Sequence, residues 1–383
     1  MKISSKVLNM APSGIRAFFD LVIGMKDVIS LGVGEPDFVT PWHIRESGIY
    51  AVEKGYTSYT SNKGLMELRK AISKFLKNKH GLDYDPEDEI LITVGVSEGY
   101  DLAIRAMVER GDKVIVPEPY YVAYGPIVDL SGGKAVYLRT KAEDGFKLRP
   151  EDLLATCDKG TIAMVLNYPN NPTGAAYTRK ELLAIADIAK KKDITVISDE
   201  VYEDLTYDGK HTAFPTLPGM RERTIYLNGF SKAYAMTGWR IAYAAGPKEI
   251  IAAMTKVHQY TMLCASIISQ MAAMEAMRNG GRAVAEMTRE YRRRREYLIS
   301  RLNEMGLSCH KPEGAFYAFP SIKSSGLSSM DFAHRLLKEE KVAVVPGTAF
   351  GASGEGYVRM CYAASFDNIR EAMSRIERFL CRM

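Results

Sequence analysis

Lys232 is the residue of this sequence whose setting best fits covalent chemistry. It follows the apolar stretch 224–227 after a break at Asn228-Gly229, and Ser231 precedes it directly. An amine is a nucleophile only when neutral, and an unperturbed lysine has a pKa of about 10.4. Burial or nearby positive charge lowers that pKa. Arg240 supplies such a charge and could also hold a phosphate. These residues predict imine chemistry beside a phosphate, although a Ser-Lys pair at a helix start is also common on protein surfaces.

Other polar groups follow further apolar stretches that the sequence predicts as strands. Gly95-Val96-Ser97 follows the stretch 90–94 and leads into a helix predicted over 100–108, whose free N–H groups suit a phosphate. The polar segment 167–174 follows the stretch 162–166, and Asp199-Glu200-Val201-Tyr202 follows 194–198. Ligands of open parallel sheets bind outside the carboxyl ends of the strands. Each group alone could be an ordinary cap or turn, but together they predict a site for a phosphorylated aldehyde cofactor.

The residue types fit the chemistry of such a cofactor. Lys232 would form an imine with the aldehyde and, once released, would carry a proton as general base and general acid. Asp199 would pair with a protonated pyridine nitrogen, so that the ring remains an electron sink. Asn171 and Tyr202 could donate hydrogen bonds to the ring oxygen.

In order and spacing, these motifs resemble those of the class I and II pyridoxal-phosphate-dependent aminotransferases, which have fold type I. The resemblance covers nearly the whole chain, and within the family the sequence is most similar to archaeal aromatic aminotransferases. The motifs that carry it are Gly34-Glu35-Pro36-Asp37, Asn171-Pro172-Thr173-Gly174, Asp199-Glu200-Val201-Tyr202, Phe230-Ser231-Lys232 with Arg240, and Val358-Arg359-Met360.

The resemblance implies a cofactor, pyridoxal 5'-phosphate, and a role for each site residue. It implies Lys232 as the Schiff-base lysine and catalytic residue, with Asp199 as the partner of the ring nitrogen. The remaining implied cofactor ligands are Asn171 and Tyr202 at the ring oxygen, Tyr121 stacked on the ring, the amides of Val96 and Ser97 with Ser231 and Arg240 at the phosphate, and Tyr59 of the partner subunit. The implied ligands of the substrate α-carboxylate are Arg359, Gly34 and Asn171.

Two positions depart from the family pattern. Gly229 stands where many relatives have a serine that binds the phosphate, and Ser97 stands where related bacterial aspartate aminotransferases carry a lysine for a second carboxylate. We therefore expect a transaminase that favours aromatic L-amino acids as donors and uses a 2-oxo acid such as 2-oxoglutarate. The alternatives are an aspartate aminotransferase and a β-eliminating carbon–sulfur lyase of the same fold. Arg16 could contact substrate, but a solvated helix position explains it better.

The elements that position these residues are predicted from the rhythm of the sequence. Continuous apolar stretches alternate with helical patterns from residue 89 to 247, which predicts a mostly parallel sheet covered by helices. Long helices and short strands follow, which predicts a smaller α+β domain. The predicted divisions are an N-terminal arm with part of the small domain over 1–45, a large cofactor-binding domain over 46–280 and a small domain over 281–383. A helix is also predicted over 15–25, and the arginine run 292–295 is predicted as a solvated helix face.

Composition narrows the class of protein. The chain has 383 residues, of which 46% are hydrophobic and 25% charged, and its net charge of +5 gives no reason to expect nucleic acid. Five scattered cysteines predict neither a metal site nor a disulfide framework. Neither a signal peptide nor an apolar run of membrane length is recognised. We expect a cytoplasmic homodimer without membrane or nucleic-acid partners. A transcription regulator with an aminotransferase-like domain is a weak alternative, because few residues precede Gly34.

Overall fold

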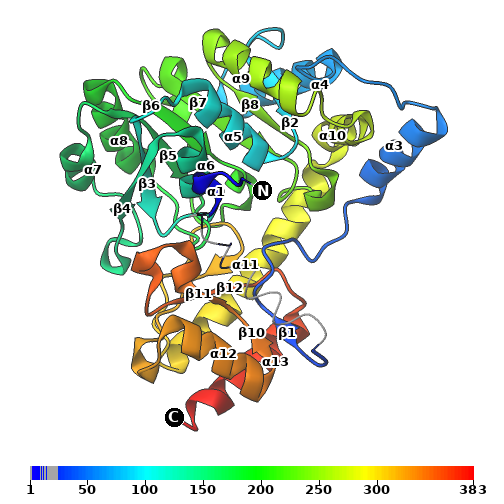
Figure 1. The fold of residues 1–383 in the computed structure, drawn as a ribbon. Coiled ribbons are helices and arrows are strands. Elements are labelled where there is room, and N and C mark those ends of the chain that lie inside the picture. Colours follow the sequence, from blue (N-terminus) through cyan, green and yellow to red (C-terminus); the bar gives the residue numbers. More distant parts are fainter. Residues whose placement is uncertain (1, 9, 11, 13, 15–24) are drawn as a thin grey trace.

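A seven-stranded sheet forms the centre of the protein in the computed structural model, which describes residues 2–8, 10, 12, 14 and 25–383 (Figure 1). Its spatial order is β2-β8-β7-β6-β5-β3-β4. The strands are β2 (Ile90–Thr93), β3 (Lys113–Glu118), β4 (Lys134–Arg139), β5 (Thr161–Asn167), β6 (Thr195–Asp199), β7 (Thr224–Gly229) and β8 (Ala242–Ala245).

The sheet is mostly parallel, as predicted from its continuous apolar strands. Pairs among β4, β3, β5, β6 and β7 are parallel, whereas β8 runs antiparallel to both β7 and β2. Asn167 pairs with Asp199, and Asp199 pairs with Leu227, so β5 and β6 end side by side and β7 runs two residues further, to Gly229. The loops that leave these three strands therefore begin at one edge of the sheet.

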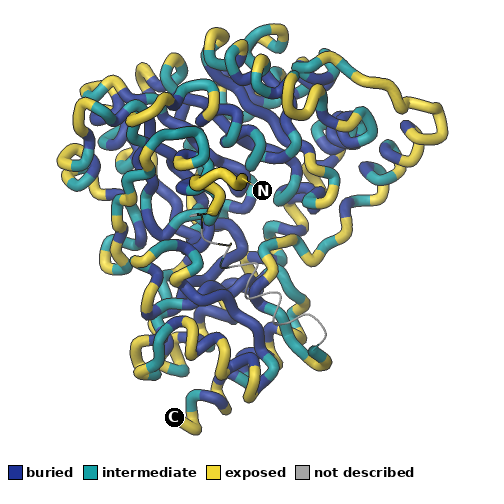
Figure 2. The backbone as a smooth tube through the Cα atoms, viewed as in Figure 1, coloured by how far each residue is buried: buried dark blue, intermediate teal, exposed yellow. Residues whose placement is uncertain are grey.

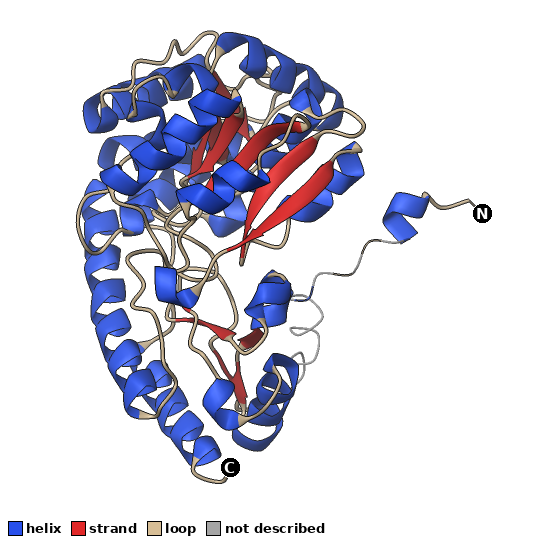
Figure 3. Cartoon of the chain, turned by 90° about the vertical axis from the view of Figure 1, so that its left-hand side faces the viewer, coloured by secondary structure: helices blue, strands red, loops and turns tan. Residues whose placement is uncertain are grey.

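Helices cover both faces of this sheet (Figure 3). On one face α5, α6 and α9 pack on side chains such as Val165 and Ile197, and on the other α7 and α8 pack on Met164 and Val196. Successive strand residues point to opposite faces, so both faces of these strands are buried, which explains their continuous apolar sequence. The helices of this part are α3 (Trp42–Glu53), α4 (Met66–His80), α5 (Val96–Met107), α6 (Tyr124–Ser131), α7 (Pro150–Thr156), α8 (Arg179–Lys192), α9 (Lys248–Thr261) and α10 (Ile267–Asn279).

A smaller α+β part lies beside the large sheet. Two small sheets, β1-β10 and β11-β12-β9, pack with three helices around a separate apolar core that includes Phe316 and Leu336. Helix α11 runs from the large part into the small one (Figure 1). The elements are β1 (Ile29–Ser30), α11 (Gly281–Glu304), β9 (Tyr317–Ala318), α12 (Ser329–Glu340), β10 (Val342–Ala343), β11 (Val345–Pro346), β12 (Val358–Cys361) and α13 (Phe366–Leu380).

Three details differ from the expectations. The sequence predicts the helix after β2 only from Tyr100, whereas α5 begins at Val96, directly after the glycine. It also predicts one strand over 342–345, where the structure has two short strands. The prediction of a solvated arginine face was wrong for Arg294 and Arg295, which are buried. Arg294 donates to both carboxylate oxygens of Asp37, and Arg295 pairs with Asp208, so each buried charge has a partner.

Two further expectations are not decided by the fold. The helix predicted over 15–25, with Arg16, falls almost wholly outside the described residues. The domain boundaries near residues 45 and 280 remain predictions. No helix in the described ranges combines the length and apolar character needed to cross a membrane.

Candidate active site

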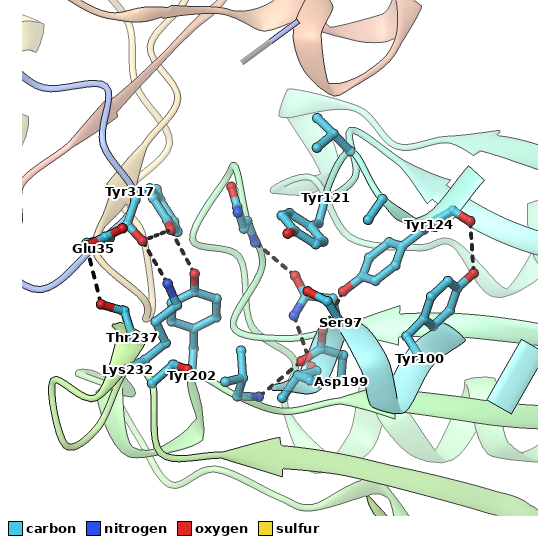
Figure 4. A pocket seen from close by; sticks show the side chains of 18 of the residues that line it. Glu35, Ser97, Tyr100, Tyr121, Tyr124, Asp199, Tyr202, Lys232, Thr237 and Tyr317 are labelled. Atoms are coloured by element: carbon cyan, nitrogen blue, oxygen red, sulfur yellow. Dashed lines mark hydrogen bonds between the residues drawn. The ribbon is translucent and has the colours of Figure 1, made fainter. Parts of the chain in front are cut away.

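A cavity of about 810 Å³ opens where the strand ends of the large sheet face the small part (Figure 4). It gathers side chains from the loops after β2, β3, β5, β6 and β7 and from the small part. Eleven of the twelve predicted site residues line it: Gly34, Val96, Ser97, Tyr121, Asn171, Asp199, Tyr202, Ser231, Lys232, Arg240 and Arg359. Residues more than 300 positions apart in the chain therefore meet in one place.

Lys232 lies in the turn after β7, with its amine inside the cavity. Its Nζ donates to the carbonyl oxygen of Gly34 at 2.7 Å, and no ion pair of this lysine is found within the described part of the chain. Burial lowers the pKa of Lys232 to about 8, with Arg359 and Arg240 acting in the same direction and Glu35 against it. An amine with such a pKa is partly neutral near neutral pH, as a nucleophile or base requires.

Asp199 ends β6 and is buried at the other side of the cavity. Its Oδ2 accepts a hydrogen bond of 2.6 Å from the Tyr124 hydroxyl, and its Oδ1 accepts one of 3.2 Å from the Val201 amide. Burial raises the pKa of Asp199 to about 6, although both hydrogen bonds act in the opposite direction. Burial therefore disfavours the ionised carboxylate, and a cationic group beside it would remove this cost.

Arg359 projects from β12 of the small part into the same cavity and is buried. Its Nη1 donates to Oδ1 of Asn171 at 2.9 Å, and its Nη2 donates to the carbonyl oxygen of Gly32 at 2.5 Å. Its Nε has no hydrogen-bond partner among the described residues although it is shielded from water. A guanidinium with an unused donor suits a carboxylate, which accepts two parallel hydrogen bonds.

The turn between β2 and α5 forms the other end of the cavity. Gly95 has a φ of +84°, and a Cβ built there would lie 2.3 Å from Nη2 of Arg240. The first N–H groups of a helix have no partner within the helix, so the amides of Val96 and Ser97 at the start of α5 are free to bind an anion. Glycine, helix start and arginine together make a cradle for a phosphate.

Tyr59 is the predicted site residue that does not line this cavity. It lies in the loop after α3, and 83% of it is exposed. Its predicted contact is with the cofactor of a partner subunit, so its absence from the cavity of its own chain neither supports nor contradicts the prediction.

The structure adds site residues that the sequence did not single out. Tyr124 binds Asp199, the Tyr317 hydroxyl lies 2.7 Å from that of Tyr202, and Asn167 donates to the carbonyl oxygen of Asp199 at 3.0 Å. The position of Tyr124 three residues after Tyr121, at the start of a helix, could have indicated a shared face. Tyr317 lies on a short strand of the small part, and no local pattern links it to the site.

Comparisons with known proteins agree with this architecture. The family model "Aminotransferase class I and II" matches residues 26–376. The chain is 53% identical to the putative aminotransferase YugH of Bacillus subtilis over 99% of this chain and 98% of that protein. It is 47% identical to an aspartate aminotransferase of Pyrococcus abyssi, again over 99% and 98%. A crystal structure of an aromatic aminotransferase from Pyrococcus horikoshii superposes with a TM-score of 0.92 at 46% identity, covering 96% of this chain and 99% of that one.

Proposed function

Because this chain belongs to the class I and II aminotransferase family, we propose that it takes amino groups from aromatic L-amino acids and passes them to a 2-oxo acid such as 2-oxoglutarate. The protein is a pyridoxal-phosphate-dependent transaminase. The observation that carries the assignment of its site is the amine of Lys232, which enters the cavity without an anionic partner in the described part of the chain.

The cavity residues fit pyridoxal phosphate at three points. Gly95 leaves room for Arg240 beside the helix start, which suits the phosphate. Asp199 is buried and its ionised form needs a cation, which suits a protonated ring nitrogen. Lys232 faces the space between them with a lowered pKa. When bound, this cofactor supplies a ring that takes up the electrons left at the substrate α-carbon.

The chain's own residues then have separate tasks. Lys232 would hold the cofactor and, once free, would carry the proton from the substrate α-carbon to the cofactor, for which a pKa of about 8 is suitable. Arg359 binds the α-carboxylate with its unused Nε donor, and Asn171 keeps the guanidinium in place. Tyr202, held by Tyr317, is positioned to donate to the ring oxygen. Tyr121 lines the cavity where a ring could stack.

The charges around the cavity support the choice of donor. Its basic side chains among the described residues are Lys232, Arg240 and Arg359, and each already has a task at the cofactor or at the α-carboxylate. The side-chain carboxylate of a donor such as aspartate would therefore find no unused basic side chain among the described residues that line the cavity. It would also come near the carboxylate of Glu35, which lines the same cavity. An apolar aromatic side chain has no such requirement.

Aspartate remains the second candidate donor because the Pyrococcus abyssi relative is named an aspartate aminotransferase. The two donors are separated by kcat/KM values measured with tyrosine, phenylalanine, glutamate and aspartate. We expect an aromatic donor to exceed aspartate by at least about tenfold, which corresponds to about 1.4 kcal/mol of transition-state binding. Aspartate exceeding every aromatic donor by tenfold would reverse the assignment.

We also propose a homodimer in which Tyr59 of each chain reaches the phosphate of the partner's cofactor. Large apolar side chains are exposed on α3 and near the end of α9, on both sides of the Tyr59 loop: Trp42, Ile49, Tyr50, Val52, Tyr260, Met262 and Leu263. Asn62 of the loop donates to the carbonyl oxygen of Leu263 at 2.8 Å, so these segments adjoin. An exposed apolar surface of this kind favours contact with a second copy.

The assignment of Lys232 is tested by borohydride reduction of the holoenzyme, which fixes the cofactor to the lysine that holds it, followed by peptide mapping. We expect the label on Lys232, and we expect Lys232→Ala to lose transamination by at least about a thousandfold. Lys256→Ala, at an exposed position of α9, is the matched control and should retain both the visible band and the activity. A label on another lysine contradicts the proposal.

A further inference from the structure

Two buried histidine–glutamate pairs lie behind the cavity, one at each end, and neither has a task in the chemistry described above. His211 pairs with Glu200 behind the end that holds Asp199, and His258 pairs with Glu98 behind the phosphate turn. Both glutamates directly adjoin proposed cofactor ligands in the sequence, since Glu200 follows Asp199 and Glu98 follows Ser97.

The pair at the ring end is largely shielded from solvent, with the side chain of Glu200 fully buried and that of His211 7% exposed. Oε2 of Glu200 accepts a hydrogen bond of 2.5 Å from Nε2 of His211. Its Oε1 accepts from the Ser198 hydroxyl at 2.6 Å and from the Phe214 amide at 3.0 Å. The Glu200 amide in turn donates to the carbonyl oxygen of Leu227 in β7 at 2.9 Å. The residue after Asp199 is therefore fixed at its carboxylate and at its backbone.

The same pair also holds the loop that carries Asn171. The ring of Tyr168 stacks on His211, with centroids 5.0 Å apart, and its hydroxyl lies 3.2 Å from Oε1 of Glu200. The Tyr168 amide donates to the carbonyl oxygen of Asp199. One carboxylate thus connects two of the loops that supply ligands for the cofactor ring, the one with Asn171 and the one with Tyr202.

Other ionisable groups surround this pair. Glu203 lies 3.9 Å from His211 and binds His80, Lys79 and the Tyr226 hydroxyl, and Lys79 also binds Asp204. The donor atoms of Glu200, Glu203 and His211 are close enough together to surround a metal ion. Each of these atoms already has a partner within the cluster, however, so the contacts favour a fixed network of ion pairs.

The pair at the phosphate end is simpler. Nδ1 of His258, which is fully buried on α9, donates to Oε1 of Glu98 at 2.7 Å. Oε2 of Glu98 accepts from the Val94 amide at 2.5 Å, just before Gly95. Nε2 of His258 has no partner among the described residues, so Glu98 is its single polar contact there. This pair closes the phosphate turn from behind.

We propose that these pairs are positioning devices that act separately, Glu200–His211 on the ring end of the cofactor site and Glu98–His258 on the phosphate end. The inference rests on the proposed placement of the cofactor. Each glutamate is attached to its cofactor ligands through the backbone, and each histidine fixes its glutamate from a different part of the chain. Loss of a histidine should therefore loosen one end of the site and leave the other in place.

The test uses the full chain freed of cofactor and two probes that each occupy one end. Pyridoxal lacks the phosphate and reports on the ring end, whereas inorganic phosphate reports on the turn at Gly95. We expect His211→Phe to weaken pyridoxal binding about tenfold, the scale of outer-shell effects at other sites, and to leave phosphate binding within about twofold. His258→Phe should give the reverse result.

Conservative variants separate positioning from general damage to the fold. His211→Gln places an amide donor near the position of Nε2, and His258→Asn places one near Nδ1, so each should restore most of the lost affinity. The visible band of the holoenzyme should shift in His211→Phe and stay unchanged in His258→Phe, because the band reports on the groups around the ring.

The outcomes are distinguishable. If both phenylalanine variants weaken both probes to the same extent, or if neither weakens a probe, the separate positioning roles are wrong. If the two variants fail to separate the probes while borohydride still labels Lys232 in the unchanged protein, only the positioning inference is overturned. If the label lies elsewhere, the proposed placement of the cofactor fails first, and the positioning pairs fail with it.

Discussion

At the scale of single residues, Asp199 shows how the fold prepares a charge for a ligand. Burial raises its pKa from 3.8 to about 6, so between these values the folded chain without cofactor binds a proton that the unfolded chain releases. The stability of this form therefore falls as the pH rises through that window, by at most about 3 kcal/mol. Above about pH 6 the cost of the buried charge is fully present.

A cationic ring nitrogen beside Asp199 removes this cost, which leads to a pH-dependent prediction. The increase in Tm that pyridoxal phosphate produces should be larger at about pH 7.5 than at about pH 5. In Asp199→Asn this difference between the two pH values should be smaller, because the variant has no carboxyl group to ionise. Differential scanning calorimetry of both proteins, with and without cofactor, measures it. An unchanged pH dependence in the variant would mean that Asp199 does not face a cation.

The residues that the sequence could predict are those within short local motifs. Asn171, Asp199 and Lys232 each stand at the end of an apolar stretch, so the strand pattern alone brings them to one sheet edge. Tyr124 and Asp199 are 75 positions apart and belong to different motifs. The pairing of His211 with Glu200 depends on how an irregular loop returns to the sheet, and local sequence does not encode that path.

At the scale of elements, the central strands could be predicted because burial on both faces demands unbroken apolar sequence. The start of α5 is predicted too late, at Tyr100, because Ser97, Glu98 and Gly99 are not strong interior helix formers. In the structure they form its first turn, where free N–H groups rather than helix propensity matter. The free N–H groups that give this helix its proposed function therefore lie in the turn that helix propensity predicts least well.

The turn before α5 gives a testable prediction at this scale. Gly95→Ala should weaken pyridoxal phosphate binding by at least about tenfold, because the new Cβ would meet Arg240 and the positive φ of +84° strains any other residue. Gly81→Ala is the matched control, since Gly81 has a φ of +75° at the end of α4 but open space around it.

Both substitutions should cost about 1–3 kcal/mol of folding stability through backbone strain. Only Gly95→Ala should change the dissociation constant of the cofactor, measured by fluorescence titration. If the two variants retain the cofactor equally well, the turn at Gly95 is not its phosphate site.

At the scale of the whole molecule, the chain exposes a loop and large aromatic side chains that a compact monomer would be expected to bury. The loop after α3 projects from the body of the protein and is exposed along most of its length (Figure 2). Tyr59 at this loop and Tyr260 near the end of α9 are 83% and 86% exposed. The polar sequence 56–63 gives no periodic signal for an interface, so a contact with another chain could be expected only from the family resemblance.

Shared sites make a prediction that no single variant can test. A C2 dimer uses the same surface on both subunits, so each chain would give a Tyr59 and receive one. Tyr59→Ala should weaken cofactor retention, and Lys232→Ala should be inactive. In a heterodimer of the two variants, one site would then lack both side chains and the other would lack neither.

We therefore expect mixing of the two variants under conditions that exchange subunits to restore activity. With statistical exchange of equal amounts, about half of the dimers are mixed, and each would contain one intact site. The recovered turnover per intact site should approach that of the unchanged enzyme, measured with saturating aromatic donor.

Lys256→Ala mixed with Lys232→Ala provides the reference, because an exposed substitution leaves every Lys256→Ala site intact whether or not subunits exchange. If Tyr59 acts within its own chain, every site of the Tyr59→Ala and Lys232→Ala mixture keeps one lesion. Its activity would then stay at the average of the two parents, and the shared site would be excluded.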